Sequence, residues 1–217
     1  VRYEEQAMDR LLKLALLMLG IICLSLYAFL FWSNRIATTP EPAAAPPSPG
    51  QDSVDLWDAY KRAQKAASAS TRDEIGRAHV STQWQAATES ALLAGANQWS
   101  FGFYEPGDKK AVDVIVTPNS ARLANQTRVW DAPATLGEGA WQQGPRDALL
   151  VFLARGGREF LQKHQQAVVS MHLANGEETG PFWDVAAVTM GDRSLVAVRI
   201  DAETLEVVST TSEIGEG

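Results

Sequence analysis

The stretches Trp99–Thr117 (WSFGFYEPGDKKAVDVIVT) and Trp183–Asp201 (WDVAAVTMGDRSLVAVRID) decide the fold, because they align without a gap at an offset of 84 residues. In both, a tryptophan opens the stretch, a Gly-Asp-basic turn follows, and a valine-rich run closes it. Apolar residues at alternate positions share one face of a β-strand. Each stretch is therefore predicted to form a β-hairpin with one apolar face. Duplication of one unit explains the match, and chance similarity of two hairpins is the alternative.

An apolar sheet face needs a cover, and a helix is predicted before each hairpin. The first helix is expected to begin near Asp52 or Ser53 as N-cap, with Asp58 and Arg62 as an exposed pair one turn apart. Its buried side is predicted to hold Leu56, Tyr60, Ala63 and Ala67.

The second helix is predicted to start at Pro145, a favourable first-turn residue, and to stop at Gly156-Gly157. Leu149, Leu150 and Leu153 would form its apolar side. Further strands are expected at Ser90–Leu93 and Ala167–Leu173, so the predicted order is helix, strand, strand, strand, twice over. The predicted fold class is α+β, with two repeated units of a helix on an antiparallel sheet.

Several motifs together resemble tandem PepSY-type domains. They are the Trp-x-Phe-x-Phe run before a turn, the Gly156-Gly157-x-x-Phe160 helix exit, and the closing I-D-A-x-T-x-x-V of residues 200–207. The resemblance covers roughly residues 54–210. It implies small extracytoplasmic modules with a cystatin-like helix-on-sheet arrangement. It also implies binding, inhibitory or assembly roles, and it provides no catalytic residues to transfer.

Residues 14–32 (LALLMLGIICLSLYAFLFW) form a run of nineteen without a charge. As a helix this run spans roughly 28 Å, about the hydrocarbon thickness of a bilayer. A cleavable signal peptide is the alternative, but the bulky end of the run favours a retained interfacial anchor. The segment is therefore predicted to be one transmembrane helix, with anchor residues Leu14, Gly20, Ser25, Tyr27 and Trp32.

The cations that flank this segment predict its orientation. Arg2, Arg10 and Lys13 precede the segment, whereas Arg35 is the only cation after it before Lys61. Because Lys and Arg accumulate on the cytoplasmic side, we expect a cytoplasmic N-terminus and an extracytoplasmic C-terminal part, in a bacterial inner membrane. Residues 38–52 hold five prolines in fifteen and predict a semi-rigid spacer, with a floppy tether as the alternative.

The chain is thus expected to divide into a cytoplasmic N-terminus (1–13), a transmembrane helix (14–34), a Pro/Ala-rich linker (35–52), a first repeat (53–130), a connecting loop (131–144), a second repeat (145–210) and a C-terminal tail (211–217).

Composition and motif searches argue against several functions. The chain has 19 Lys and Arg against 26 Asp and Glu, so it lacks the basic footprint of a nucleic-acid binder. Its single cysteine and its three scattered histidines, His79, His164 and His172, have no metal-ligand spacing. Neither a nucleophile elbow nor a phosphate-binding glycine motif occurs. We therefore expect no catalytic residues, no metal and no cofactor.

Contact with other proteins is the remaining prediction. Tryptophans in Gly-rich connections are either packed under their own loop or serve as anchors in protein interfaces. The candidate partner-binding residues are Trp130, Trp141, Glu105, Pro106, Asp108 and Lys109. The expected function is that of a non-catalytic accessory subunit in a larger membrane complex, such as a respiratory or photosynthetic assembly. The alternative is a stand-alone anchored binding, inhibitory or sensor module, and an anchored enzyme is the least favoured class.

Overall fold

The computed structural model describes residues 53–137, 142–176, 180–189, 191 and 193–213. The predicted cytoplasmic N-terminus, the transmembrane segment and the whole linker lie outside these residues, and so does Trp141. Within the described ranges, no helix combines the length and the apolar character needed to cross a membrane. The expected anchor at residues 14–34 therefore stays a prediction from the sequence.

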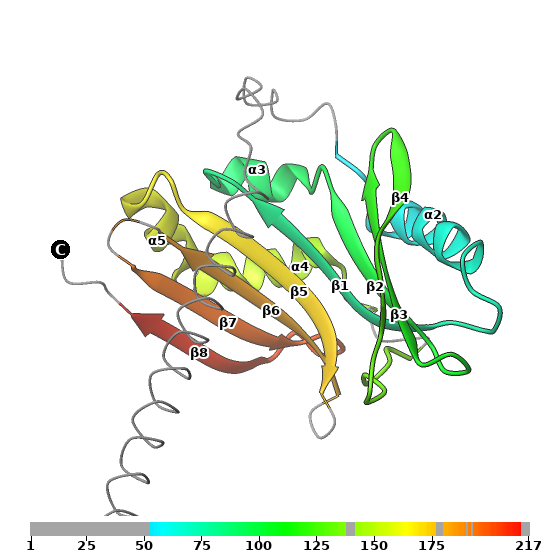
Figure 1. The fold of residues 1–217 in the computed structure, drawn as a ribbon. Coiled ribbons are helices and arrows are strands. Elements are labelled where there is room, and N and C mark those ends of the chain that lie inside the picture. The colour runs from blue at the N-terminus through cyan, green and yellow to red at the C-terminus, as the bar shows by residue number, and fades with distance from the viewer. Residues whose placement is uncertain (1–52, 138–141, 177–179, 190, 192, 214–217) are drawn as a thin grey trace, which may run out of the picture. The chain divides into compact units, whose positions relative to one another are not determined.

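Eight antiparallel strands form one continuous sheet in the order β4-β3-β2-β1-β5-β6-β7-β8 (Figure 1). The strands are β1 (Gly76–Trp84), β2 (Trp99–Glu105), β3 (Lys110–Thr117), β4 (Ser120–Arg128), β5 (Val168–Gly176), β6 (Gly180–Val188), β7 (Leu195–Asp201) and β8 (Val207–Glu213). Each half of the sheet is a four-stranded meander, and the first strands of the two halves pair with each other at the centre.

This pairing makes the expected fold class, two separate helix-on-sheet units, wrong. β1 and β5 run side by side from the pair His79 and Ala174 to the pair Trp84 and Val169. Each strand would otherwise leave an edge of unpaired backbone groups in the middle of the molecule, and joining the edges satisfies those groups. The result is a single sheet with two free edges instead of four. The resemblance to PepSY-type domains and the duplication stay predictions.

The two predicted hairpins are confirmed, with equivalent register. Trp99 pairs with Val116 in the β2–β3 hairpin, and Trp183 pairs with Ile200 in the β6–β7 hairpin. Both pairs are related by the offset of 84 residues that aligns the two stretches. Alternation places the valines of β3 and the aliphatic residues of β7 in the core, as expected: Val112, Val114, Val116, Val196, Val198 and Ile200.

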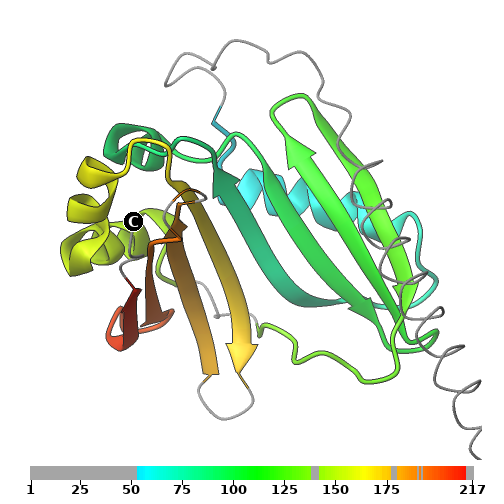
Figure 2. The same ribbon diagram turned by 60° about the vertical axis from the view of Figure 1, so that its left-hand side comes forward.

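A layer of helices covers one face of the sheet (Figure 2). Its members are α2 (Leu56–Ser68), α3 (Glu89–Ala94), α4 (Pro145–Phe152), a π-helical turn η1 (Leu153–Gly157) and α5 (Arg158–Lys163). In the described part of the chain, every helix lies on this face, and the opposite face carries none. We refer to the second face as the open face.

The first helix differs in detail from its prediction. Its N-cap is Asp55, whose carboxylate accepts hydrogen bonds from two backbone N–H groups, those of Trp57 and Asp58. Asp58 pairs with Lys61 at 3.5 Å instead of with Arg62. Arg62 does not pair with Asp58 because its guanidinium donates to the Pro118 carbonyl at 3.1 Å, in the turn between β3 and β4. The buried residues of α2 are Leu56, Ala59, Ala63 and Ala67, with Tyr60 only partly buried.

The segment predicted as a strand at Ser90–Leu93 is the helix α3, so that prediction is wrong. The Thr88 hydroxyl accepts the Ala91 N–H at 3.1 Å and caps the helix. Gly95, at φ +101°, ends it. The capping residues at both ends therefore determine that this short segment is helical. Its few apolar residues form too short a run to show a helical or strand period.

The predicted helix stop at Gly156-Gly157 is confirmed, because the helix that begins at Pro145 is interrupted there and a second helix, α5, starts directly after it. Arg155 and Gly156 leave helical geometry, with Gly156 at φ +107° and ψ −16°, and helical geometry resumes at Gly157. Gly157 is needed for space, since a Cβ atom there would lie 2.4 Å from Cε1 of Phe152. The first helix therefore ends at Gly156, and Gly157 begins the second helix in contact with the ring of Phe152.

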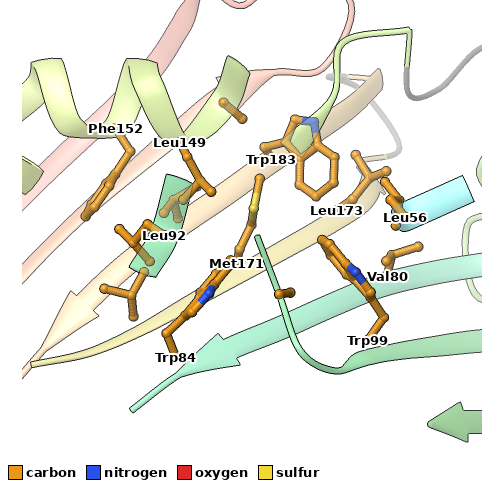
Figure 3. Close-up of a cluster of buried hydrophobic side chains, with 14 of the residues drawn as sticks. Leu56, Val80, Trp84, Leu92, Trp99, Leu149, Phe152, Met171, Leu173 and Trp183 are labelled. Carbon is orange, nitrogen blue, oxygen red and sulfur yellow. The ribbon is translucent and has the colours of Figure 1, made fainter. Parts of the chain in front are cut away.

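The core lies between the helices and the sheet, and tryptophans occupy its centre (Figure 3). Trp99 and Trp183 are buried, as expected. The Trp99 indole N–H donates to the Val54 carbonyl at 2.9 Å, and that of Trp183 donates to the Gln143 carbonyl at 3.4 Å. Each acceptor lies two residues before the first residue of a covering helix. The two indoles therefore bind the start of each helix to the sheet.

Candidate functional site

The turn that joins β2 and β3 projects from one end of the sheet. Its residues Pro106, Gly107, Asp108 and Lys109 are all exposed. The Lys109 N–H donates to the Pro106 carbonyl at 3.3 Å, and Lys109 has the left-handed φ of +50°. A Cβ atom on Gly107 would meet the carboxylate of Asp73, so the turn packs tightly against the loop before β1. These contacts hold the turn in a defined conformation.

Glu105 fixes the base of the same turn. Its side chain is fully buried, and Oε1 accepts the backbone N–H groups of Asp73 at 3.0 Å and Arg72 at 2.6 Å. These hydrogen bonds favour the carboxylate and hold the pKa of Glu105 below its usual value of 4.5. A buried side chain cannot contact a partner, so the expectation that Glu105 binds one is wrong. It positions the turn.

Trp130 lies beside this turn because of the β3–β4 register. Arg128, the last residue of β4, pairs with Lys110, and the Val129 N–H donates to the Lys109 carbonyl at 2.8 Å. The Arg128 guanidinium also reaches the Asp108 carbonyl at 3.5 Å. The chain therefore delivers Trp130 to the corner of the sheet where the turn projects. We call the set of Pro106, Asp108, Lys109, Arg128 and Trp130 the Trp130 corner.

Trp130 is 94% exposed, the highest value among the large hydrophobic side chains that the structure describes as exposed. Trp57, another exposed tryptophan on α2, is only 46% exposed. An indole in water keeps a large apolar surface hydrated, and burial of that surface in an interface is favourable. The corner also holds Arg128, and tryptophan and arginine are both enriched in interface hot spots.

The open face carries a second group of polar side chains near the β1–β5 pairing. The imidazole rings of His79 and His172 lie 5.5 Å apart between centroids. Next to His172 in the ladder is Asp184, which forms a two-pronged ion pair with Arg199, with both N–O distances 2.8 Å. This cluster could not be predicted from the sequence spacing, because 93 positions separate the two histidines and only the strand pairing brings them together.

This cluster gives no support for a metal centre. Among the residues that the structure describes, no group of three or more His, Cys, Asp or Glu side chains could hold a metal ion. Asp184 has both carboxylate oxygens engaged by Arg199. The imidazole of His79 lies directly over Gly102, where a Cβ atom would meet the ring at 2.2 Å. The two histidines are packed parts of the sheet surface.

The histidine pair predicts acid sensitivity. Burial, and next the positive charge that His79 can carry, lower the pKa of His172 below its usual 6.5, against the opposing effect of Asp184. The unfolded chain then binds a proton at higher pH than the folded chain does. Stability is therefore retained above pH 6.5 and falls as the pH drops through the folded-state pKa.

Thermal melting of the protein between about pH 7.5 and pH 5 tests this dependence. We expect the melting temperature to fall with pH over this range and the decline to become shallower in His172→Gln. His164 lies at the C-terminal end of α5, in the helix layer, so His164→Gln is the control for the loss of one histidine. An unchanged decline in His172→Gln would contradict the assignment.

No family model matches the chain, and no curated protein matches it. Among solved structures, the chain is similar to a "putative lipoprotein" from Clostridium difficile 630, with 10% identity and a TM-score of 0.48. The alignment covers 75% of this chain and 95% of that one. A likeness at this level does not establish a shared fold or a shared function.

Proposed function

We propose that the chain is a non-catalytic contact module that docks on a partner protein through the Trp130 corner. The observation that supports this most directly is the exposure of Trp130, at 94%, on a corner whose backbone is fixed by hydrogen bonds. A rigid corner loses little conformational entropy when it binds. A tryptophan that is held ready in this way is a favourable anchor for an interface.

The sequence supports a place for this module outside the cytoplasm. The uncharged run of residues 14–32 has the length of a transmembrane helix, and the flanking cations favour a cytoplasmic N-terminus. In this proposal, residues 14–34 anchor the chain in a bacterial inner membrane, and residues 35–52 hold the sheet away from the bilayer. The partner is another subunit of a membrane complex.

Mild-detergent extraction of the full chain, followed by native electrophoresis and mass spectrometry, tests the proposal. Co-migration with a defined set of proteins at fixed stoichiometry supports an accessory subunit. Migration of the chain alone supports the stand-alone binding module and contradicts the accessory role.

Trp130→Ala tests the corner itself. Removal of an exposed indole leaves the core intact, so we expect a melting temperature close to that of the wild type. Truncation of a hot-spot side chain costs about 2 kcal/mol or more of binding energy, which corresponds to a loss of affinity of about 30-fold. Quantitative pull-down of the partner subunits with full-length protein would measure this loss.

Trp57→Ala is the matched control, because Trp57 is an exposed tryptophan on α2 at a different site. We expect this variant to retain wild-type binding. Full retention of the partner by Trp130→Ala, or equal losses in both variants, would remove the support for the corner.

A further inference from the structure

The two free edges of the sheet, β4 and β8, are both open to a further strand. Among the residues that the structure describes, each of them has a neighbouring strand on one side only. Residues 122–128 of β4 and residues 208–213 of β8 are all exposed. Neither strand contains proline or lysine, two of the residue types with which proteins protect such edges. Each strand contains one β-bulge, at Ala124 and Val208, which leaves regular strand on one or both sides of it.

The two edges differ in charge. β4 contains Arg122 and Arg128 and no acidic residue. The helix α2, which packs beside it, adds three basic residues against the single acidic residue Asp58, which pairs with Lys61. β8 ends in Glu213, and after Arg199 the chain holds no Lys or Arg at all. Over larger segments, residues 53–130 hold 9 basic and 8 acidic residues, whereas residues 131–217 hold 6 basic and 13 acidic residues. The net negative charge of residues 53–217 is thus concentrated in the half that includes β8.

We propose that β4 of one copy of this chain pairs with β8 of a second copy, which extends the sheet from one molecule to the next. Backbone hydrogen bonds between the two edges would provide the attraction common to strand addition. The side-chain charges would select the combination, because β4 against β4 places arginines together and β8 against β8 places glutamates together. Only the β4–β8 combination brings opposite charges into contact.

The geometry of this contact determines how assembly proceeds. Two different surfaces meet, so each added copy leaves one β4 edge and one β8 edge free at the ends of the assembly. Assembly therefore proceeds step by step with concentration and does not stop at a dimer unless a ring closes. Because the charges are exposed, salt weakens the contact: the Debye length falls from about 30 Å at 0.01 M to about 3 Å at 1 M.

Sedimentation velocity of the full chain in a mild detergent tests the proposal. We expect the average mass of the wild type to rise with protein concentration at low salt and to return to the monomer value at high salt. Two charge-reversal variants test the surfaces: Arg122→Glu with Arg128→Glu, and Glu206→Lys with Glu213→Lys. Each variant alone then has two edges of like charge, and we expect its self-association to weaken by at least tenfold.

A mixture of the two reversal variants provides the decisive measurement. It restores opposite charges between the β4 edge of one variant and the β8 edge of the other, so we expect association to return. Arg155→Glu, on the helix layer, is the control for a reversed charge away from the sheet edges and should associate like the wild type. Trp130→Ala should also associate like the wild type. A failure of the edge pairing can therefore be distinguished from a failure of the proposed docking through the Trp130 corner.

A wild type that stays monomeric at low salt and high concentration would overturn the proposal. A mixture of the two reversal variants that does not associate would overturn it as well. Self-association that persists in either reversal variant alone would show that another surface, or pairing between identical edges, carries it, and would also refute the proposed contact.

Discussion

Trp183→Ala is expected to lower the free energy of unfolding by about 3–5 kcal/mol, the range typical of a truncated buried aromatic residue. Trp183 is fully buried at the centre of β6, where it pairs with Leu173 on β5 and Ile200 on β7. Removal of the indole leaves a cavity between these strands and α4. It also removes the hydrogen bond from the indole N–H to the Gln143 carbonyl, just before α4 begins.

Urea denaturation monitored by circular dichroism would measure this loss. Trp183→Phe separates the two contributions, because it retains most of the apolar volume and loses only the hydrogen bond and part of the ring. We expect it to cost distinctly less than Trp183→Ala. A loss below about 1 kcal/mol for Trp183→Ala would contradict the central position of this residue.

Gly157→Ala is expected to destabilise the protein by about 1–3 kcal/mol, although helix propensity alone predicts the opposite sign. The backbone at Gly157 is helical, with φ −58° and ψ −41°, so alanine fits the local conformation. The added Cβ atom, however, would lie 2.4 Å from Cε1 of Phe152. Phe152 is itself fully buried in the core, where packed neighbours oppose a shift of its ring.

The same denaturation experiment tests this prediction, with Gly137→Ala as the control. A Cβ atom on Gly137 meets nothing within 4 Å, so we expect its effect to stay within about 0.5 kcal/mol. Gly157→Ala combined with Phe152→Leu should recover part of the loss, because the smaller side chain relieves the clash. Stabilisation by Gly157→Ala alone would show that helix propensity outweighs the contact.

Local sequence patterns predicted the features of the fold that depend on residues close together in the chain. The period of two in Trp99–Thr117 and Trp183–Asp201 gave both hairpins with their buried faces, and the core positions of Trp99 and Trp183 followed from it. The first covering helix was predicted with its N-cap two or three positions before Asp55, since several polar residues there could serve as caps.

Pairing between distant strands could not be predicted in this way. β1 and β5 meet across more than eighty residues of chain, and nothing in either strand alone specifies the other as its partner. The edge strands β4 and β8 were missed because they are polar and exposed on both faces, so they show no alternation of apolar residues. The single sheet, and the opposite charges at its edges, follow only from the three-dimensional arrangement.

The candidate site was likewise predicted in part, where local residues determine it, and missed where distant residues do. Turn chemistry correctly placed Pro106, Asp108 and Lys109 in a turn between two strands, since proline, glycine and aspartate together are typical of turns. It also led to the incorrect inclusion of Glu105, because burial of a carboxylate depends on the loop at Arg72 that folds over it. The proximity of Trp130 to the turn depends on the β3–β4 register, which no local pattern of residues specifies.

The central position of β1 has a consequence for the order of events during synthesis. When the ribosome has completed β4, the first meander can form, but the far side of β1 has no neighbour until β5 emerges, which begins at Val168. For the time needed to make that intervening segment, the growing chain exposes an unpaired strand whose core-facing residues Ala78, Val80 and Trp84 are apolar. Binding by chaperones, or premature pairing with another nascent chain, would be most effective in this interval.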